Sequence, residues 1–498
     1  MRIVKPLWVD HHGLPIFSVD IHPDGKRLAT CGGDSNIVIW NIEPIVDYFR
    51  EDDEEEKGSD SDSDDTNYKG TPKILCSINN AHFKSVNSVK WSKDGKYLAS
   101  VSDDRECIIW TLSPIQTPNT PEIWVSAANL RGHGGDITEV SWSPNNEYLA
   151  TCRIIKKFPK QGDFIKGIAW DPIGEYLACQ SDGQISVWDT TDWVCQFQFK
   201  GVGGLNLQSF FLRSSWTPDG KYFVATQGYS KKRHSAILID RDSFRNKPND
   251  NGDGYGDDDG DGDGDGDGDG DGDGDGDGDG DGDGDGDGDG DGDGDGDGDG
   301  DGDGDGDGEV DGNVNSNGNG KSKNTFECVG HNKAVIISKC SPIIFKDNSN
   351  NLFTLVLVGS VNSSLSLWLS PTNDSSSTRP IMYFGQLFYN SIQDISWCPD
   401  GLSFFVCSSE GSVTYFSFDL HEIEDGSLQP ITFREKQQYF KNAYNFNFPK
   451  EIELFVHKRN LIKTKRFKST AEVIATQKQS ISSSGKKRIT PVTSKSCE

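Results

Sequence analysis

The chain has 498 residues, enough for several domains or for one large all-β domain with insertions. Its net charge of −30 is local, because residues 251–312 hold 30 acidic residues and no Lys or Arg. Removing these 30 from the 79 acids leaves 49 acids against 49 bases, which excludes a uniformly acidic protein and indicates a near-neutral body with charged insertions.

The composition also argues against secreted, membrane and disulfide-rich proteins. The N-terminal residues lack the apolar core of a secretory signal, and the longest apolar run, 352–361, is too short to span a bilayer, so no membrane partner is expected. The eleven cysteines occur without a C-x-x-C pair, which favours free thiols in a reducing compartment over disulfides or a zinc site. We expect Cys107 and Cys179, in strand-like segments, to be buried.

One unit is repeated seven times over residues 1–420. Each strong copy has an alternating strand, a tight turn, a second strand such as Tyr-Leu-Ala-Ser, an Asp-containing turn and a third strand that ends in Trp. This pattern predicts an all-β, seven-bladed WD-repeat propeller, with the strand-like residues 2–9 completing the last blade. The units lie at 17–40, 86–110, 137–152, 165–188, 212–226, 334–345 with 358–368, and 392–416.

The His, Asp and Trp residues that recur in these units are predicted to be structural. The turn Asp precedes the strand-ending Trp by six residues in the strong units, and a Gly-His pair occurs twice. Because buried polar groups need partners, we expect these side chains to bond one another rather than to bind metal or act in catalysis, and we expect the His11-His12 pair to have a turn role. The predicted structural residues are Asp34, Trp40, His82, Asp104, Trp110, His133, Asp182, Trp188, His331 and Trp368, with Asn362 and Glu410 in the Asp position of the last two units.

The third unit is incomplete. Trp142 and Trp170 are 28 residues apart, whereas Trp91 and Trp142 are separated by 51. The turn Asp, the third strand and its Trp are missing, so a truncated blade with unpaired backbone groups is predicted near residues 150–163. Either this blade is defective or the sequence has lost an internal segment. We favour the second explanation because the other units are well kept.

Two acidic insertions, 50–70 and 246–323, are predicted to be disordered, because charge repulsion and glycine entropy oppose packing. The Asp-Gly tract should lie within or beside blade five. Its Asp residues have the wrong spacing from Glu309 for an EF-hand loop, so no calcium site is expected. Passive repeat expansion and an electrostatic decoy for a basic partner both remain open, and we favour the first.

Several of these strings resemble the HIRA/Hir histone-regulator family. They are "WVDHHGLPIFSVDIHPDGKRLAT", "IKGIAWDPIGEYLACQSDGQISVWDTTDW", "VGHNKAVIISKCSPIIF" and "SIQDISWCPDGLSFFVCSSEGSV". The likeness covers residues 1–420 outside the Asp-Gly tract and returns at "KKRITP". It implies a non-catalytic scaffold for replication-independent nucleosome assembly and transcriptional regulation in the nucleus. The family usually continues into a long C-terminal domain, whose functions are not carried over.

The C-terminal part is expected to be a basic linker, 421–478, followed by a mostly disordered tail, 479–498. Residues 450–498 carry 12 Lys or Arg against 4 Glu. Through the resemblance, the tail hexapeptide is similar to the family's B motif, which docks the anti-silencing-factor histone chaperone by adding a short strand to its sheet. The residues of this predicted docking site are Lys486, Lys487, Arg488, Ile489, Thr490 and Pro491, with Ile489 entering an apolar pocket and the basic residues reaching carboxylates.

Other partners and functions follow from the same residues. The resemblance implies the other subunits of a HIRA-type complex and indirect contact with histones, while the basic run 458–468 fits nuclear import or weak DNA contact. An adaptor of another chromatin-assembly complex or of a ubiquitin ligase is the alternative, although it leaves the tail motif unexplained. No G-x-S-x-G, H-E-x-x-H or P-loop motif is present, so neither an enzyme nor a cofactor is expected.

Overall fold

The computed structural model describes most of the repeat region and part of the C-terminal segment. The described residues are 1–46, 72–115, 121–153, 165–200, 209–230, 232–245, 325–372, 378–424, 427–446, 478–481 and 487–490. Both predicted acidic insertions, 50–70 and 246–323, lie outside them.

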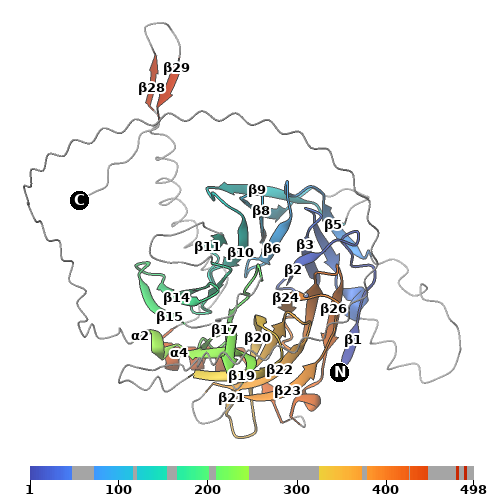
Figure 1. Ribbon diagram of the computed structural model, residues 1–498, viewed down its shortest axis with the longest axis vertical. Coiled ribbons are helices and arrows are strands. Elements are labelled where there is room, and N and C mark those ends of the chain that lie inside the picture. The colour runs from blue at the N-terminus through green and yellow to red at the C-terminus, as the bar shows by residue number, and fades with distance from the viewer. Residues whose placement is uncertain are drawn as a thin grey trace, which may run out of the picture. The chain divides into compact units, whose positions relative to one another are not determined.

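Six antiparallel sheets of four or five strands and one two-stranded sheet follow one another along the chain (Figure 1). We call the full sheets blades 1, 2, 4, 5, 6 and 7 and the two-stranded sheet unit 3. Blade 1 contains β2 (Ile16–Ile21), β3 (Arg27–Gly32), β4 (Ile37–Asn41) and β5 (Ile74–Ile78); blade 2 contains β6 (Val86–Trp91), β7 (Tyr97–Ser102), β8 (Glu106–Leu112) and β9 (Trp124–Arg131); unit 3 contains β10 (Ile137–Trp142) and β11 (Leu149–Arg153).

The second half of the ring begins at blade 4. Blade 4 contains β12 (Gly167–Trp170), β13 (Tyr176–Gln180), β14 (Gln184–Asp189) and β15 (Cys195–Lys200); blade 5 contains β16 (Ser215–Trp216), β17 (Tyr222–Ser230), β18 (Arg233–Asp240) and β19 (Thr325–His331), with α2 (Asp242–Arg245) after β18; blade 6 contains β20 (Val335–Lys346), β21 (Leu352–Ser360), β22 (Leu365–Pro371) and β23 (Arg379–Phe384); blade 7 contains β24 (Ile392–Trp397), β25 (Ser403–Ser408), β26 (Val413–Ser417) and β1 (Arg2–Val4).

Seven blades were predicted and the described residues form six, so the number seven is not confirmed. The sequence also predicted that the third unit would be truncated, and this is confirmed, because β10 and β11 form a two-stranded sheet. The physical reason is chain length: only 13 residues separate β11 from β12, whereas 34 separate β7 from β10 and include two strands.

The sheets close into a ring through their innermost strands. In chain order, each innermost strand packs against the next one, and the last packs against the first (Figure 1). These strands are β2, β6, β10, β12, β16, β20 and β24. The predicted closing strand is confirmed, because β1 pairs with β26 from Arg2 opposite Ser417 to Val4 opposite Tyr415. The Asp-Gly tract was correctly assigned to blade 5, because it separates the paired strands β18 and β19.

The hydrophobic core is divided among the interfaces between neighbouring sheets. One cluster joins blades 1 and 2 through residues such as Ile39 and Val89, both fully buried, and another joins blades 6 and 7. Residues from blade 2 and unit 3 form a smaller cluster that includes Val101 and Ile137. Burying each such side chain contributes about 1.5–3 kcal/mol, so the interfaces supply most of the stability.

Part of the predicted linker 421–478 is folded. After α3 (Leu420–Glu424), β27 (Gln429–Pro430) pairs with the end of β20, and α4 (Phe433–Tyr444) follows. A capping box between Thr432 and Glu435 begins the helix, and Phe440 is 1% exposed. β-Pairing and the burial of Phe440 therefore hold residues 429–444 of the predicted linker against the propeller.

The tail also contains regular structure. β28 (Lys478–Ile481) and β29 (Lys487–Thr490) form an antiparallel hairpin in which Gln479 lies opposite Ile489 (Figure 1). The tail was predicted to be mostly disordered, and the hairpin places seven of its residues, 479–481 and 487–490, in paired strands. Among the helices that the structure describes, none is both long and apolar enough to cross a membrane.

Candidate interaction sites

Blades 1 and 2 contain the predicted hydrogen-bond networks. In blade 2, His82 Nδ1 lies 2.8 Å from Asp104 and its Nε2 lies 2.7 Å from Ser100 Oγ, while Trp110 donates its indole N–H to the same hydroxyl at 2.9 Å. His82, Ser100 and Trp110 are buried, so these bonds satisfy groups that water does not reach, while Asp104 is half-buried. The structural role predicted for the three residues fits this arrangement.

Blade 1 has the same network with a histidine that the sequence pattern did not assign. His11, 1% exposed, places Nδ1 2.9 Å from Asp34 and Nε2 2.8 Å from Thr30 Oγ1. Trp40 donates to the same hydroxyl at 2.7 Å. The turn role expected of the His11-His12 pair is thus incomplete, because His11 replaces the Gly-His signature in this network.

Blades 4, 6 and 7 depart from the pattern. In blade 4, Asp182 pairs with Lys166 at 2.5 Å, and Trp188 is half-buried. In blade 6, His331 lies 2.8 Å from Ser364 and 2.7 Å from Ser366, which also accepts the Trp368 indole N–H at 2.8 Å.

The substituted positions also find partners. Asn362 accepts the Ser364 hydroxyl at 2.7 Å in blade 6. Glu410, in the Asp position of blade 7, pairs with Lys5 at 2.8 Å and accepts the Tyr389 backbone N–H. The Asp position therefore keeps a hydrogen-bonding role where its identity changes.

Unit 3 keeps the inner half of the network. His133 Nε2 lies 2.7 Å from Thr151 Oγ1, which matches the bond between His11 and Thr30. No third strand in the described part of this unit supplies a Trp to Thr151. His133 therefore bonds Thr151 in a network that the described residues leave without its indole.

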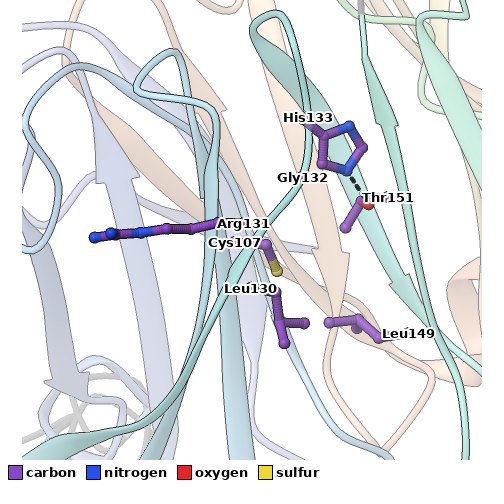
Figure 2. A pocket seen from close by; sticks show the side chains of 7 residues that line it. All are labelled: Cys107, Leu130, Arg131, Gly132, His133, Leu149 and Thr151. Atoms are coloured by element: carbon purple, nitrogen blue, oxygen red, sulfur yellow. Dashed lines mark hydrogen bonds between the residues drawn. The ribbon is translucent and has the colours of Figure 1, made fainter. Parts of the chain in front are cut away.

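A cleft lies beside this incomplete network. Its cavity of about 400 Å³ falls between the outer strands of blade 2 and β11 and is lined by Cys107, Leu130, Arg131, Gly132, His133, Leu149 and Thr151. Figure 2 shows Cys107, Leu130 and Leu149 converging on one another, while Arg131 points away. Burial raises the pKa of the Cys107 thiol to about 12, so the thiol is protonated and contributes an apolar surface rather than a nucleophile.

A buried arginine that joins several sheets of the propeller was not predicted. Arg213, 1% exposed, precedes β16 and directs two N–H groups to Glu139 on β10, at 2.8 and 2.9 Å. Its other N–H groups reach the backbone oxygens of Phe17, Asn87 and Gln393, at 3.0, 2.9 and 2.8 Å. All five donors of the guanidinium have acceptors, and the acceptors belong to the innermost strands of four different sheets.

Asp394 completes this central charge cluster. Burial would raise its pKa, but Arg213 and then Lys90 oppose burial, so the pKa of Asp394 lies well below its usual range. Lys90 Nζ is 2.8 Å from the carboxylate, and Ser18 donates to it at 2.7 Å. The cluster is satisfied internally, so it holds the ring together and offers no open catalytic group.

The described residues show no gathering of three or more His, Cys, Asp or Glu side chains that could hold a metal ion. Cys107 is buried as predicted, whereas Cys179 is half-buried. The structure describes only part of the predicted docking peptide. Lys487–Thr490 forms β29, while Lys486 and Pro491 lie outside the described residues.

Comparison with known proteins supports the repeat assignment. Residues 4–41, 73–111, 124–154 and 153–189 match the family described as "WD domain, G-beta repeat". The third match is the shortest and runs directly into the fourth, as the truncation of unit 3 requires. The predicted WD-repeat propeller is thereby confirmed as the fold class.

Longer matches link the chain to one group of proteins. Protein HIRA of Dictyostelium discoideum is 40% identical over 467 residues, which cover 89% of this chain and 32% of that protein. Protein HIRA of Homo sapiens is 30% identical over 89% of this chain and 37% of its own length. Protein HIR1 of Cryptococcus neoformans is 33% identical over 49% of this chain and 29% of its own. The chain is therefore homologous to HIRA proteins along most of its length and to HIR1 over about half of it, which confirms the resemblance, and it spans about a third of those relatives.

Proposed function

We propose that the chain is a non-catalytic scaffold of a HIRA-type histone chaperone complex and acts in replication-independent nucleosome assembly in the nucleus. The observation that carries this proposal is homology to HIRA proteins over 89% of the chain. A rigid propeller supports it, because strands fixed by the Arg213 cluster present surface loops in constant positions to several partners at once. Transcriptional regulation follows from control of nucleosome assembly.

In this proposal the propeller is built from seven repeat units, and unit 3 is a third blade that lacks its outer strands. The closed sequence of innermost strands supports this interpretation, because β10 occupies one step of the ring between β6 and β12. Unit 3 thus maintains the ring even though its sheet is reduced.

The tail hairpin supports a docking role for Lys486–Pro491. β29 pairs with β28 along one edge, and the two strands make up the whole sheet among the described residues. The other edge of β29 offers backbone donors and acceptors to a partner strand, the mode of binding called β-augmentation. The proposed partner is an anti-silencing-factor-type chaperone that carries histones to the complex.

Calorimetry with the full chain tests this docking. Replacing Ile489→Asp should weaken binding of that chaperone about 10- to 100-fold, because burial of one isoleucine contributes about 1.5–3 kcal/mol. Ile481→Asp, on the paired strand β28, is the matched control and should bind as the parent does. Equal affinity of the Ile489→Asp chain and the parent would contradict the assignment and leave nuclear import as the role of the three basic residues Lys486, Lys487 and Arg488.

A further inference from the structure

Two strands of the propeller share one sequence but differ in their surroundings. β3 contains Leu28-Ala29-Thr30-Cys31, and β11 contains the same four residue types at 149–152. All four are 0% exposed in β3. In β11, Leu149, Ala150 and Thr151 are half-buried, although their residue types and their position next to an innermost strand are the same.

The difference arises from the third strand. In blade 1, β4 covers β3 with Trp40 opposite Leu28, Ile39 opposite Ala29 and Val38 opposite Thr30. Trp40 donates to Thr30, and Asp34, six residues before it, contacts His11. The tetrapeptide of β3 is thus covered and hydrogen-bonded by the third strand of its blade, β4.

The cleft at unit 3 lies at the position that corresponds to β4 in blade 1. Leu149, the counterpart of Leu28, lines it, and so do Thr151 and His133, the counterparts of Thr30 and His11. Figure 2 shows the His133–Thr151 bond at the edge of the cleft, with Leu149 facing Leu130 across it. The cavity of about 400 Å³ falls within the size range of ligand pockets in proteins.

The connection between β11 and β12 lacks the Trp that a third strand would supply. It has 13 residues, 154–166, and none of them is Trp. In blade 2 the corresponding connection has 34 residues, 103–136, and contains β8 and β9. The connection after β11 is therefore 21 residues shorter than its counterpart in blade 2.

We propose that this cleft and the outer edge of β11 bind an extended segment of another protein chain as a third strand. The segment carries a Trp that lies opposite Leu149 and donates its indole N–H to Thr151 Oγ1, and an Asp six residues before that Trp. Between them, apolar side chains face the cleft at alternate positions, as in β4. The identical tetrapeptides of β3 and β11 define this partner chemistry.

A peptide with the sequence of residues 33–41, Gly-Asp-Ser-Asn-Ile-Val-Ile-Trp-Asn, is the probe. Fluorescently labelled and titrated with the full chain, it should bind saturably and raise the thermal unfolding midpoint. Hydrogen exchange should slow at Leu149–Cys152 on binding, because backbone amides of β11 gain partners. Absence of binding, or slowed exchange at β3 without any at β11, would overturn the proposal.

Paired substitutions test the indole bond without altering the fold of the propeller. The peptide with Phe in place of its Trp should bind about tenfold more weakly, since one hydrogen bond and a well-packed ring system are lost. The chain with Thr151→Val should lose a similar factor, and the two changes together should cost little more than either alone. Thr111→Val, on β8, is the control that keeps full affinity. Equal binding of the Trp and Phe peptides to the parent chain would contradict the assigned register.

Discussion

Blade 1 and unit 3 contain the same tetrapeptide, Leu-Ala-Thr-Cys, yet only blade 1 buries it completely. In blade 1, β3 has a strand on each side, β2 and β4. In unit 3, the described residues place β10 on one side of β11 and a cleft near the other. The burial of a strand in this propeller therefore depends on its neighbours as much as on its own residues.

The inner halves of the two sheets are nevertheless held alike. Arg213 donates to the Phe17 carbonyl of β2 and to the Glu139 carboxylate of β10. This shared contact explains how unit 3 keeps its place in the ring with half a sheet. The outer strands add burial, while the Arg213 cluster fixes the innermost strands.

Breaking the shared contact should give the largest effect. Arg213→Met leaves Glu139 and Asp394 buried with fewer partners, so we expect the free energy of unfolding to fall by about 3–5 kcal/mol. Urea denaturation measures this loss, and Arg233→Met, at an exposed site on β18, is the control. Similar unfolding midpoints for the two variants would show that the cluster does not hold the ring.

The second prediction compares the two threonines directly. Thr30→Val removes the partner of both Trp40 and His11, so it should cost about 2–4 kcal/mol, because two buried ring nitrogens lose a bond. Thr151→Val should cost less than about 1 kcal/mol, because its site is half-buried and only the His133 bond is lost. Thermal unfolding of both variants checks the difference, and equal losses would mean that the outer strand contributes nothing to the network.

Blade 6 extends the comparison to a network built on serines instead of Asp. Burial, and to a smaller extent His234, lowers the pKa of His331 to about 4. The unfolded chain, with a histidine pKa of about 6.5, binds a proton that the folded chain excludes, so stability should fall as pH decreases from about 6.5 to about 4. The loss amounts to about 3 kcal/mol, and it should be smaller in His331→Gln. An unchanged pH slope in that variant would assign the effect to other groups.

Much of the fold could be predicted from residues close together in sequence. The turn Asp and the strand Trp six residues apart, such as Asp104 and Trp110, marked the third strands, and the short spacing from Trp142 to Trp170 marked the truncation. The capping box of Thr432 and Glu435 was a readable signal for α4, but the basic composition around it favoured a linker.

The Arg213 cluster could not be predicted in the same way. Three of its acceptors are backbone carbonyls, which carry no residue signature, and they come from strands far apart in the sequence. His11 was missed because Asp-His-His stands where the networks of His133 and His331 show Gly-His. The lining of the cleft could not be predicted because it brings together residues of blade 2, such as Cys107, and of unit 3, such as Leu149 (Figure 2).

Native-state hydrogen exchange at the two identical tetrapeptides tests the central claim most directly. Amides of Leu28–Cys31 should open only in large-scale unfolding, because β3 is buried and paired on both sides. Amides of Leu149–Cys152 should exchange at least about 100-fold faster, since a missing outer strand lowers the cost of local opening by several kcal/mol. Equal protection of the two segments would contradict the account, because it would mean that β11 is covered as completely as β3.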